Sequence, residues 1–440
     1  MMRSPAARPL ALALSALLVV AACGATTVPS SPPPSGTSAP SGSATPATPA
    51  PSSSTAPSGT PVPDDVAAAI YDAIEQQVLD IRGLEAVDVQ RETIGAEALK
   101  EMNAQSFDED NPADYVAGNE RLLKALGLLD EGASLRTLYL DLIDSQVAGF
   151  YRPDRKTLYV VSRSGAINGA DKITFAHEYQ HALQDANFPG VFDAQMELLD
   201  QTDQAMARAA VYEGDATLLM SLWAIPNLAP EELQDVVAAG SDPESAAVLA
   251  RTPPILVEGL LFPYNSGISF VTPIQTAGGW EGVDDLFGAL PESTEQVLHP
   301  EKYAAGEAPI PVPLADDLAE RLGEGWTVLI RDTFGEFQLR TWLTQSGIDA
   351  TTAGEAAAGW GGDRLAVASG PDGRWAVVLR TAWDTDVDAA AFADSAVIAV
   401  SGLPHPARIA APGGREVTIL IASDDDALLG LDKVFGATGV

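Results

Sequence analysis

Cysteine is nearly absent from this sequence, and basic residues are scarce. Cys23 is the only cysteine among 440 residues, so no disulfide can form within the chain. The 25 lysines and arginines are far outnumbered by 61 aspartates and glutamates, which gives a formal net charge of −36. Such an acidic chain repels polyanions, which excludes nucleic acid and anionic lipid headgroups as partners.

The hydrophobic run at the N-terminus is too short to span a membrane. It covers residues 10–22 and follows Arg3 and Arg8, whereas a transmembrane helix needs about 20 residues. This pattern predicts a signal peptide over residues 1–22. The stretch that ends at Cys23, Val-Ala-Ala-Cys, resembles the bacterial lipobox. The resemblance implies a lipid anchor on Cys23 that holds the protein at the extracytoplasmic face of the membrane. The alternative is an ordinary secretory signal with an incidental cysteine.

Composition divides the rest of the chain. Residues 23–63 are almost wholly Ser, Pro, Thr, Ala and Gly, a composition that cannot bury enough apolar surface to fold and that predicts a disordered tether. The folded part begins near Asp64. We expect a catalytic domain over residues 64–314 and an α+β region over residues 315–440. Residues 64–145 could also serve as a lid.

Hydrophobic periodicity predicts an α+β fold. Apolar residues recur at helical spacing in several stretches, and two β-rich runs flank Pro153. The expected helices are 64–81, 112–126, 172–185 and 202–223, and the expected hairpin strands are 146–152 and 157–163. In the C-terminal region we expect a hairpin across 370–373, a helix over 386–400, a strand over 415–423 and a short helix over 424–436.

The most informative motif is His-Glu-Tyr-Gln-His at residues 177–181, which contains two of the chain's four histidines. Residues four apart share one face of a helix, so His177 and His181 could bind one metal ion. Glu178 would then contact the metal's water, whose pKa zinc lowers to about 7, and act as general base. The alternative is a pair of solvated surface histidines, but the apolar neighbours Phe175 and Leu183 favour a buried helix.

A catalytic zinc needs a third protein ligand. Gln184 and Asn187 do not fit the metzincin pattern. Glu213 lies in the stretch Glu-Gly-Asp-Ala, and here the sequence resembles the gluzincins, zinc peptidases whose third ligand is a glutamate on a downstream helix. The resemblance implies one catalytic zinc and a zincin-like core, in which an edge hairpin lies beside the active-site helix. It also implies that Glu213 is the third ligand. Rival ligands are Glu197, Asp200 and Asp203.

Several further residues are candidates for supporting roles. Some gluzincins have an aspartate one turn after the glutamate ligand, where this chain has Thr217. Asp215 points about 200° away around the helix from Glu213, so the partner of the ligating histidines stays open. Candidates for hydrogen bonding to the oxyanion are Tyr264, His299 and Tyr303, although structural roles for them are the alternative.

The sequence therefore predicts a membrane-anchored zinc peptidase that acts on a peptide or protein. The resemblance implies that one strand of the hairpin (Val147–Tyr151 or 157–161) pairs with the substrate, and the alternative is an ordinary core hairpin. The alternatives are a solute-binding or adhesive lipoprotein and an inactive peptidase with structural zinc, for which His299 is the first candidate as a fourth ligand. Stretches downstream resemble bacterial HExxH proteins of unassigned biological role. The substrate and the oligomeric state stay open.

Overall fold

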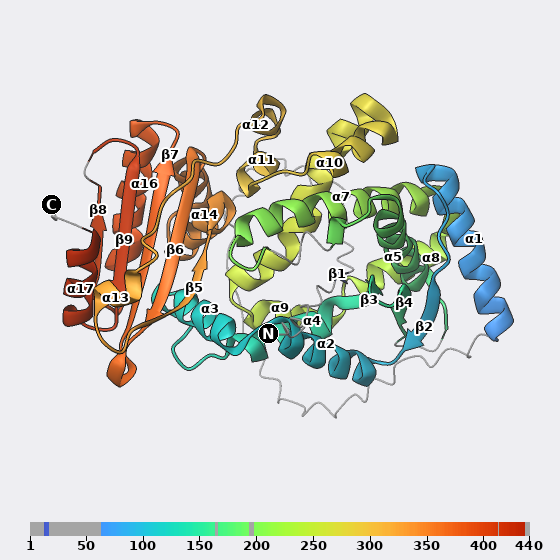
Figure 1. The fold of residues 1–440 in the computed structure, drawn as a ribbon. Coiled ribbons are helices and arrows are strands. Elements are labelled where there is room, and N and C mark those ends of the chain that lie inside the picture. The colour runs from blue at the N-terminus through green and yellow to red at the C-terminus, as the bar shows by residue number, and fades with distance from the viewer. Residues whose placement is uncertain (1–12, 17–62, 163–165, 193–197, 412, 436–440) are drawn as a thin grey trace, which may run out of the picture.

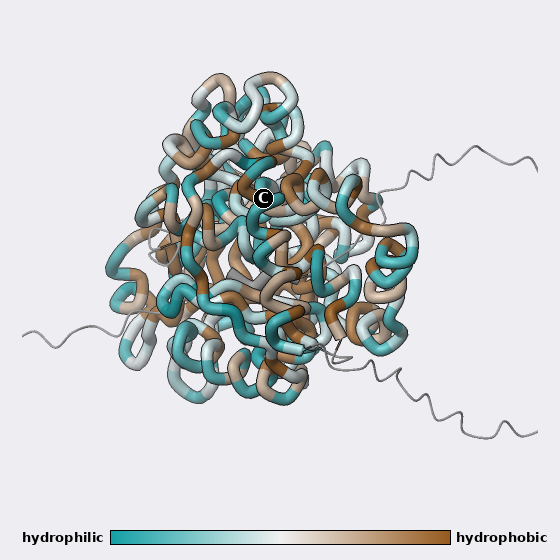
Figure 2. Tube along the Cα trace, turned by 90° about the vertical axis from the view of Figure 1, so that its right-hand side faces the viewer, coloured by the Kyte–Doolittle hydropathy of each residue, from teal (hydrophilic) through white to brown (hydrophobic). Residues whose placement is uncertain are grey.

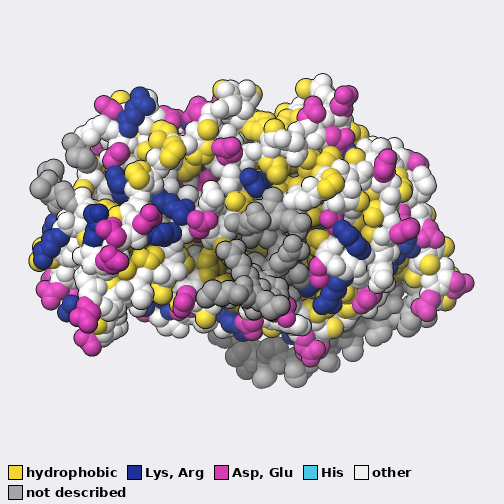
Figure 3. Space-filling view, in the orientation of Figure 1, with side chains coloured by type: hydrophobic (Ala, Val, Ile, Leu, Met, Phe, Trp, Pro, Cys, Tyr) yellow, Lys and Arg dark blue, Asp and Glu magenta, His cyan; other side chains and the backbone are white. Residues whose placement is uncertain are grey.

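The structure is a computed structural model that describes residues 13–16, 63–162, 166–192, 198–411 and 413–435. It contains many helices and two sheets, which confirms the α+β class. Hydrophobic segments concentrate toward the interior (Figure 2), and acidic side chains are spread over the face drawn in Figure 3. No helix in the described ranges is both long and apolar enough to cross a bilayer. Cys23 and almost all of the expected tether lie outside these ranges.

The first sheet belongs to the region that carries the HExxH motif. Its strand order is β1-β3-β4-β2, with β2 parallel to β4 and the other pairs antiparallel. Its strands are β1 (Ala13–Ala16), β2 (Gln90–Ile94), β3 (Val147–Arg152) and β4 (Thr157–Val161). The helices of this region are α1 (Asp64–Arg82), α2 (Ala96–Asp110), α3 (Ala113–Ala125), α4 (Leu135–Gln146), α5 (Gly169–Asn187), α7 (Thr202–Asn227), α8 (Pro230–Ala239), α9 (Pro243–Arg251), α10 (Pro254–Gly288), α11 (Thr294–Leu298) and α12 (Pro300–Ala305).

Helix α5 has a well-defined start and an unusually buried body. Asn168 accepts hydrogen bonds from the backbone of Ala170 and Asp171, and the Asp171 side chain accepts one from the Asn168 backbone, which forms a capping box. Phe175 and Leu183 pack with Tyr151 of β3 and residues of α1 and α7 in one core. The motif therefore lies on a core helix, as the apolar neighbours in the sequence predict.

The second sheet forms the C-terminal region, at the left of Figure 1. All its neighbouring strands are antiparallel, in the order β5-β6-β7-β9-β8. Its strands are β5 (Thr327–Asp332), β6 (Trp360–Ser369), β7 (Trp375–Trp383), β8 (Ala407–Ala410) and β9 (Glu416–Ala422). The accompanying helices are α13 (Leu318–Leu322), α14 (Gly335–Gln345), α15 (Ala350–Ala357), η1 (Pro371–Gly373), α16 (Asp386–Ser401) and α17 (Asp425–Phe435).

The two regions share a hydrophobic core. Leu122 of α3 packs in the same cluster as Val367 and Val377 of the second sheet, and the Trp342 indole of α14 donates a hydrogen bond to the Leu126 carbonyl at 3.1 Å. Helix α3 thus belongs to the first region in sequence and to the second in packing. The boundary near residue 314 stays a prediction.

The expected elements match the structure closely, with a few differences. The structure confirms the expected hairpins and long helices, but α5 begins at Gly169 and α7 extends to Asn227. Helix α3 begins at Ala113, with Pro112 as its N-cap, one residue later than expected. The sequence analysis missed β1, β2, β5 and β8, and it gave no bounds for several helices, among them α2, α4, α10 and α14. Strands β2 and β8 lie at sheet edges and β8 is only half-buried, so their sequences lack a strong alternating pattern.

Candidate metal centre

His177, His181 and Glu213 converge in the interior of the first region. The two histidines lie on α5 and the glutamate on α7, and all three side chains are buried. His177 Nε2 is 3.1 Å from Glu213 Oε2 and 3.1 Å from His181 Nε2, and His181 Nε2 is 3.4 Å from Glu213 Oε2. The three atoms form a nearly equilateral triangle.

The size of this triangle fits a metal ion. Tetrahedral zinc with bonds of about 2.0–2.2 Å to nitrogen and oxygen holds its ligand atoms roughly 3.3–3.5 Å apart. The observed separations of 3.1 to 3.4 Å are close to that range. Two imidazoles and one carboxylate are also a ligand set that zinc accepts in catalytic sites. The residues present therefore fit zinc.

The electrostatics of the three groups are coupled. Burial opposes charge on Glu213, but the adjacent His181 and His177 outweigh burial and lower the pKa of its carboxyl to about 2. Burial also opposes charge on His181, yet the Glu213 carboxylate raises the pKa of that imidazole to about 9. Burial lowers the pKa of His177. Among the described residues, Glu213 forms ion pairs with these two histidines and with no lysine or arginine.

A buried hydrogen-bond network holds the Nδ1 side of the His181 ring, opposite the side that faces Glu213. Its Nδ1 is 2.9 Å from Gln184 Oε1, and Gln184 Nε2 donates to the Tyr212 carbonyl at 3.0 Å and to Asp215 Oδ2 at 2.9 Å. Asp215 also accepts from Gln180 Nε2 at 2.7 Å and from Arg82 Nε of α1 at 3.2 Å. This arrangement directs Nε2 of His181 toward Glu213 and His177.

This network identifies the hydrogen-bond partner of a proposed histidine ligand, which the sequence left open. Asp215 faces α5 although it points away from Glu213 on its own helix, and it reaches His181 through Gln184. Gln184 appears in the sequence analysis only as a mismatch to another family. Because Gln184 lies three residues after His181 on the same helical face, the sequence could have predicted their contact. The sequence could not predict the contact of Arg82 with Asp215, because Arg82 comes from a distant helix.

A close helix crossing shapes the other side of the site. A Cβ on Gly214 of α7 would lie 2.5 Å from the Gly267 backbone, and one on Gly267 of α10 would lie 2.2 Å from the Ala210 carbonyl oxygen. Only glycine fits at this contact. Gly214 thus allows α7 to approach α10, and Tyr264, one turn before Gly267, has its ring centroid 6.2 Å from that of His177.

The Glu178 side chain lies where α5 packs against β3. Its side chain is fully buried, and a Cβ on Gly149 of β3 would be 3.4 Å from Glu178 Cγ and 2.5 Å from Thr174 Cγ2. Gly149 therefore lets β3 pass directly over the first turns of the motif. The hairpin and Glu178 are neighbours in space.

The structure places the other candidate residues elsewhere. His299 Nε2 is 2.9 Å from Glu336 Oε1 of α14, and it is not part of the metal-ligating group found among the described residues. The Tyr303 hydroxyl donates to the Ala289 carbonyl at 2.6 Å. Thr217 Oγ1 is buried and has no hydrogen-bond partner among the described residues. The structure thus gives His299 no place as a fourth ligand.

The rival ligands are accounted for as well. Asp200 pairs with Arg364, and Asp203 accepts hydrogen bonds from Thr294. Glu197 lies outside the described residues. Asp200 therefore contacts the C-terminal region, and Asp203 is bonded to α11.

Comparisons with known proteins give one match. Residues 327–429 match a family described as a domain of unknown function (DUF8575), which corresponds to most of the C-terminal region and not to the HExxH region. No curated protein matches the chain. No solved structure matches it either.

Proposed function

We propose that this protein is a zinc-dependent peptidase with a gluzincin-like site in a zincin-like core. The observation that carries the proposal is the triangle of His177, His181 and Glu213 ligand atoms, 3.1 to 3.4 Å apart, beside the buried carboxyl of Glu178. A structural zinc site would need a fourth protein ligand. The group among the described residues has only three.

The residues divide the chemistry of peptide hydrolysis among them. His177, His181 and Glu213 would hold the zinc, which when bound supplies a Lewis acid that polarises a carbonyl and lowers the pKa of water to about 7. Glu178 would accept the proton of the attacking water and deliver it to the leaving nitrogen. Tyr264 is close enough to His177 for its hydroxyl to be a candidate donor to the oxyanion.

Strand β3 is the proposed substrate-binding strand. It pairs with β4 on one side and with β1 on the other, where Leu14 lies opposite Phe150 and Ser15 opposite Gly149. Since β1 falls within the expected signal peptide, its removal would expose this edge of β3. The pairing supports binding of an extended peptide next to Glu178 by strand addition. Strand β4 is less suitable because β3 and β2 flank it on both sides.

The proposal includes the location of the protein. Lipidation at Cys23 would tether the peptidase to the extracytoplasmic face of the membrane through residues 23–63. Its substrates would then be peptides or proteins outside the cytoplasm.

The test compares the purified protein with its Glu178→Gln variant. We expect both to bind one zinc per chain, and we expect the variant to lose hydrolysis of a mixed peptide library by about 10²–10⁴-fold, the usual contribution of a general base. Glu301→Gln, at a glutamate whose side chain is 77% exposed, is the matched control and should keep full activity. Equal hydrolysis by Glu178→Gln and the unaltered protein would refute the proposed mechanism.

A further inference from the structure

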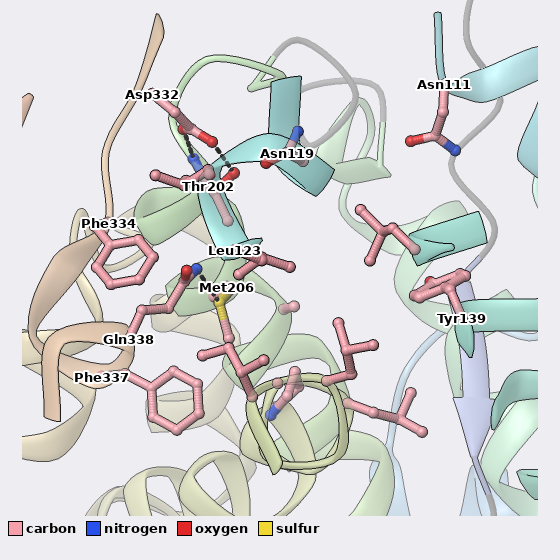
Figure 4. Close-up of a pocket in the computed structure, with 18 of the residues that line it drawn as sticks. Asn111, Asn119, Leu123, Tyr139, Thr202, Met206, Asp332, Phe334, Phe337 and Gln338 are labelled. Atoms are coloured by element: carbon pink, nitrogen blue, oxygen red, sulfur yellow. Dashed lines mark hydrogen bonds between the residues drawn. The ribbon is translucent and has the colours of Figure 1, made fainter. Parts of the chain in front are cut away.

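A large cavity extends from the metal centre to the C-terminal region. Its volume is about 500 Å³, and its walls come from α2, α3, α4, α7, α10, β5 and α14. Phe334, Phe337 and Gln338 form one side, and Tyr139 and Asn111 lie across from them (Figure 4). The C-terminal region, whose role the sequence leaves open, is thus one wall of this cavity.

The cavity begins at the proposed zinc site. Glu213 lines it directly. Tyr264 and Phe192 also line it, and their rings lie 6.2 Å from His177 and 6.3 Å from His181, centroid to centroid. A ligand whose reacting carbonyl is at the metal centre could therefore extend into the cavity.

The lining is mainly apolar and aromatic. Besides leucines, it includes the rings of Phe107, Tyr115, Tyr139, Tyr212, Phe334 and Phe337. Several polar groups in the wall are already bonded to each other: Asp332 accepts from the backbone and hydroxyl of Thr202, and the Asn119 amide donates to the Tyr115 carbonyl. A ligand would gain mostly from burying apolar surface there.

Charge and size narrow the ligand further. Glu213 and Asp332 line the cavity, and no lysine or arginine of the described residues does. A fatty-acid carboxylate could pair only with the zinc of the proposed site, and elsewhere in the cavity it would meet Asp332 without a cation. A cavity of about 150 Å³ already accommodates benzene, so one of about 500 Å³ has room for roughly three bulky side chains.

We propose that this cavity binds two or three bulky apolar side chains of the peptide substrate, on one side of the bond to be cleaved. Phe334 and Phe337 of the C-terminal region would complete the specificity site. This inference rests on the proposed function, because it places the peptide carbonyl at the metal centre. It assigns a role in substrate selection to the matched region of unknown function.

Gly259 of α10 offers a way to block the cavity without disturbing the fold. It lines the cavity, and a Cβ built on it meets nothing within 4 Å. Gly259→Phe should fill part of the space, and replacing glycine inside a helix does not weaken the helix. Gly278→Phe is the matched control, because Gly278 lies on the same helix, has the same open surroundings and does not line the cavity.

The experiment measures binding separately from cleavage. Both glycine variants are made in the Glu178→Gln background and loaded with zinc. A dansyl-labelled peptide with a Leu-Phe-Leu segment is compared with one that has Ser-Gln-Ser. We expect Gly278→Phe to bind the apolar peptide at least about tenfold more tightly than the polar one, and Gly259→Phe to lose that preference.

Two results would overturn the inference. One is equal binding of the apolar peptide by the Gly259→Phe and Gly278→Phe variants. The other is displacement of the peptide by dansyl-undecanoic acid at lower concentrations than any apolar peptide, which would make the cavity an acyl-chain site. Because these variants need not cleave, the result does not depend on hydrolysis. Absence of hydrolysis by the unaltered protein, with this binding preference intact, would therefore count against the proposed function alone.

Discussion

The part of the chain that the structure describes contains two clusters whose geometry could hold a metal ion, and they differ in where the positive charge comes from. In the HExxH region, His177, His181 and Glu213 face each other. At the junction with the C-terminal region, Glu295, Glu307 and Asp384 surround the Lys302 ammonium at 2.5 to 3.0 Å. The second cluster already contains its cation, whereas the first combines a carboxylate with two neutral-capable imidazoles and no lysine or arginine partner among the described residues.

The pKa values of the two clusters express the same difference. His181 and His177 overcome burial and lower the pKa of Glu213 to about 2, so Glu213 is ionised at neutral pH. Burial raises the pKa of Glu295 to about 8 even though Lys302 donates to it. Three acidic side chains in close contact are therefore no sufficient sign of a metal site. The ligand types and the source of positive charge distinguish the two.

The largest effect is expected from removing a ligand of the first cluster. His181→Ala should weaken zinc binding by well over the roughly 10–100-fold that is typical of losing an outer-layer partner. Chelator competition measures the affinity. His405→Ala is the control, since His405 pairs with Glu131 at the surface, and it should bind zinc normally. Unchanged zinc affinity in His181→Ala would remove the distinction between the clusters.

The matching change in the second cluster is Lys302→Met. It leaves Glu295 buried beside two other carboxylates, and we expect it to lower the free energy of unfolding by about 3 kcal/mol. Urea denaturation measures this loss, and zinc affinity should not change. A variant as stable as the unaltered protein would show that Lys302 does not hold this cluster together.

A smaller effect should come from the side chain behind His181. Gln184→Ala removes the acceptor for His181 Nδ1 and the link to Asp215. Zinc affinity should fall by about 10–100-fold. Gln338→Ala, a change at the distant α14, is the control for an amide that contacts no proposed ligand. If the two variants have the same affinity, the network does not orient His181.

The smallest effect is expected at Asp203, a buried carboxyl group whose protonation makes the stability of the fold depend on pH. Burial raises the pKa of Asp203 to about 7, from an ordinary value of 3.8, and Asp363 adds to the shift. The folded state therefore holds this proton more tightly than the unfolded state. The stability from this proton is complete below about pH 4 and is lost as the pH rises through 7.

Asp203→Asn should flatten this dependence between pH 5 and pH 8, by on the order of 1 kcal/mol. Urea unfolding at the two pH values measures it. Asp200→Asn is the control, because the Asp200 side chain is 57% exposed, and it should follow the unaltered chain. If the stability of Asp203→Asn keeps the full pH dependence of the unaltered protein, the raised pKa of Asp203 is contradicted.

The sequence predicted the structure best where a short local pattern determines it. The spacing of His177 and His181 and the apolar residues around them predicted a buried helix, and the Glu-Gly-Asp-Ala stretch predicted the helix that brings Glu213 to them. Local rules also gave the hairpins and the helices α1, α3, α5 and α7, because turn residues and periodicity act over a few positions.

The sequence could not reveal contacts between distant segments. Arg82 reaches Asp215 from a helix 133 residues away, and the crossing of Gly214 and Gly267 becomes visible only when α7 and α10 are packed. The same holds for the cavity, whose walls come from six helices and a strand between residues 107 and 338. His299 was a reasonable candidate by residue type, but tertiary packing pairs it with Glu336.

Zinc stoichiometry tests the central claim most directly. The purified protein and its Glu213→Gln variant are equilibrated with zinc, dialysed, and analysed for metal by mass spectrometry. The account predicts one zinc per chain in the unaltered protein and markedly less in the variant. No zinc in the unaltered protein, or equal zinc in both, would contradict it.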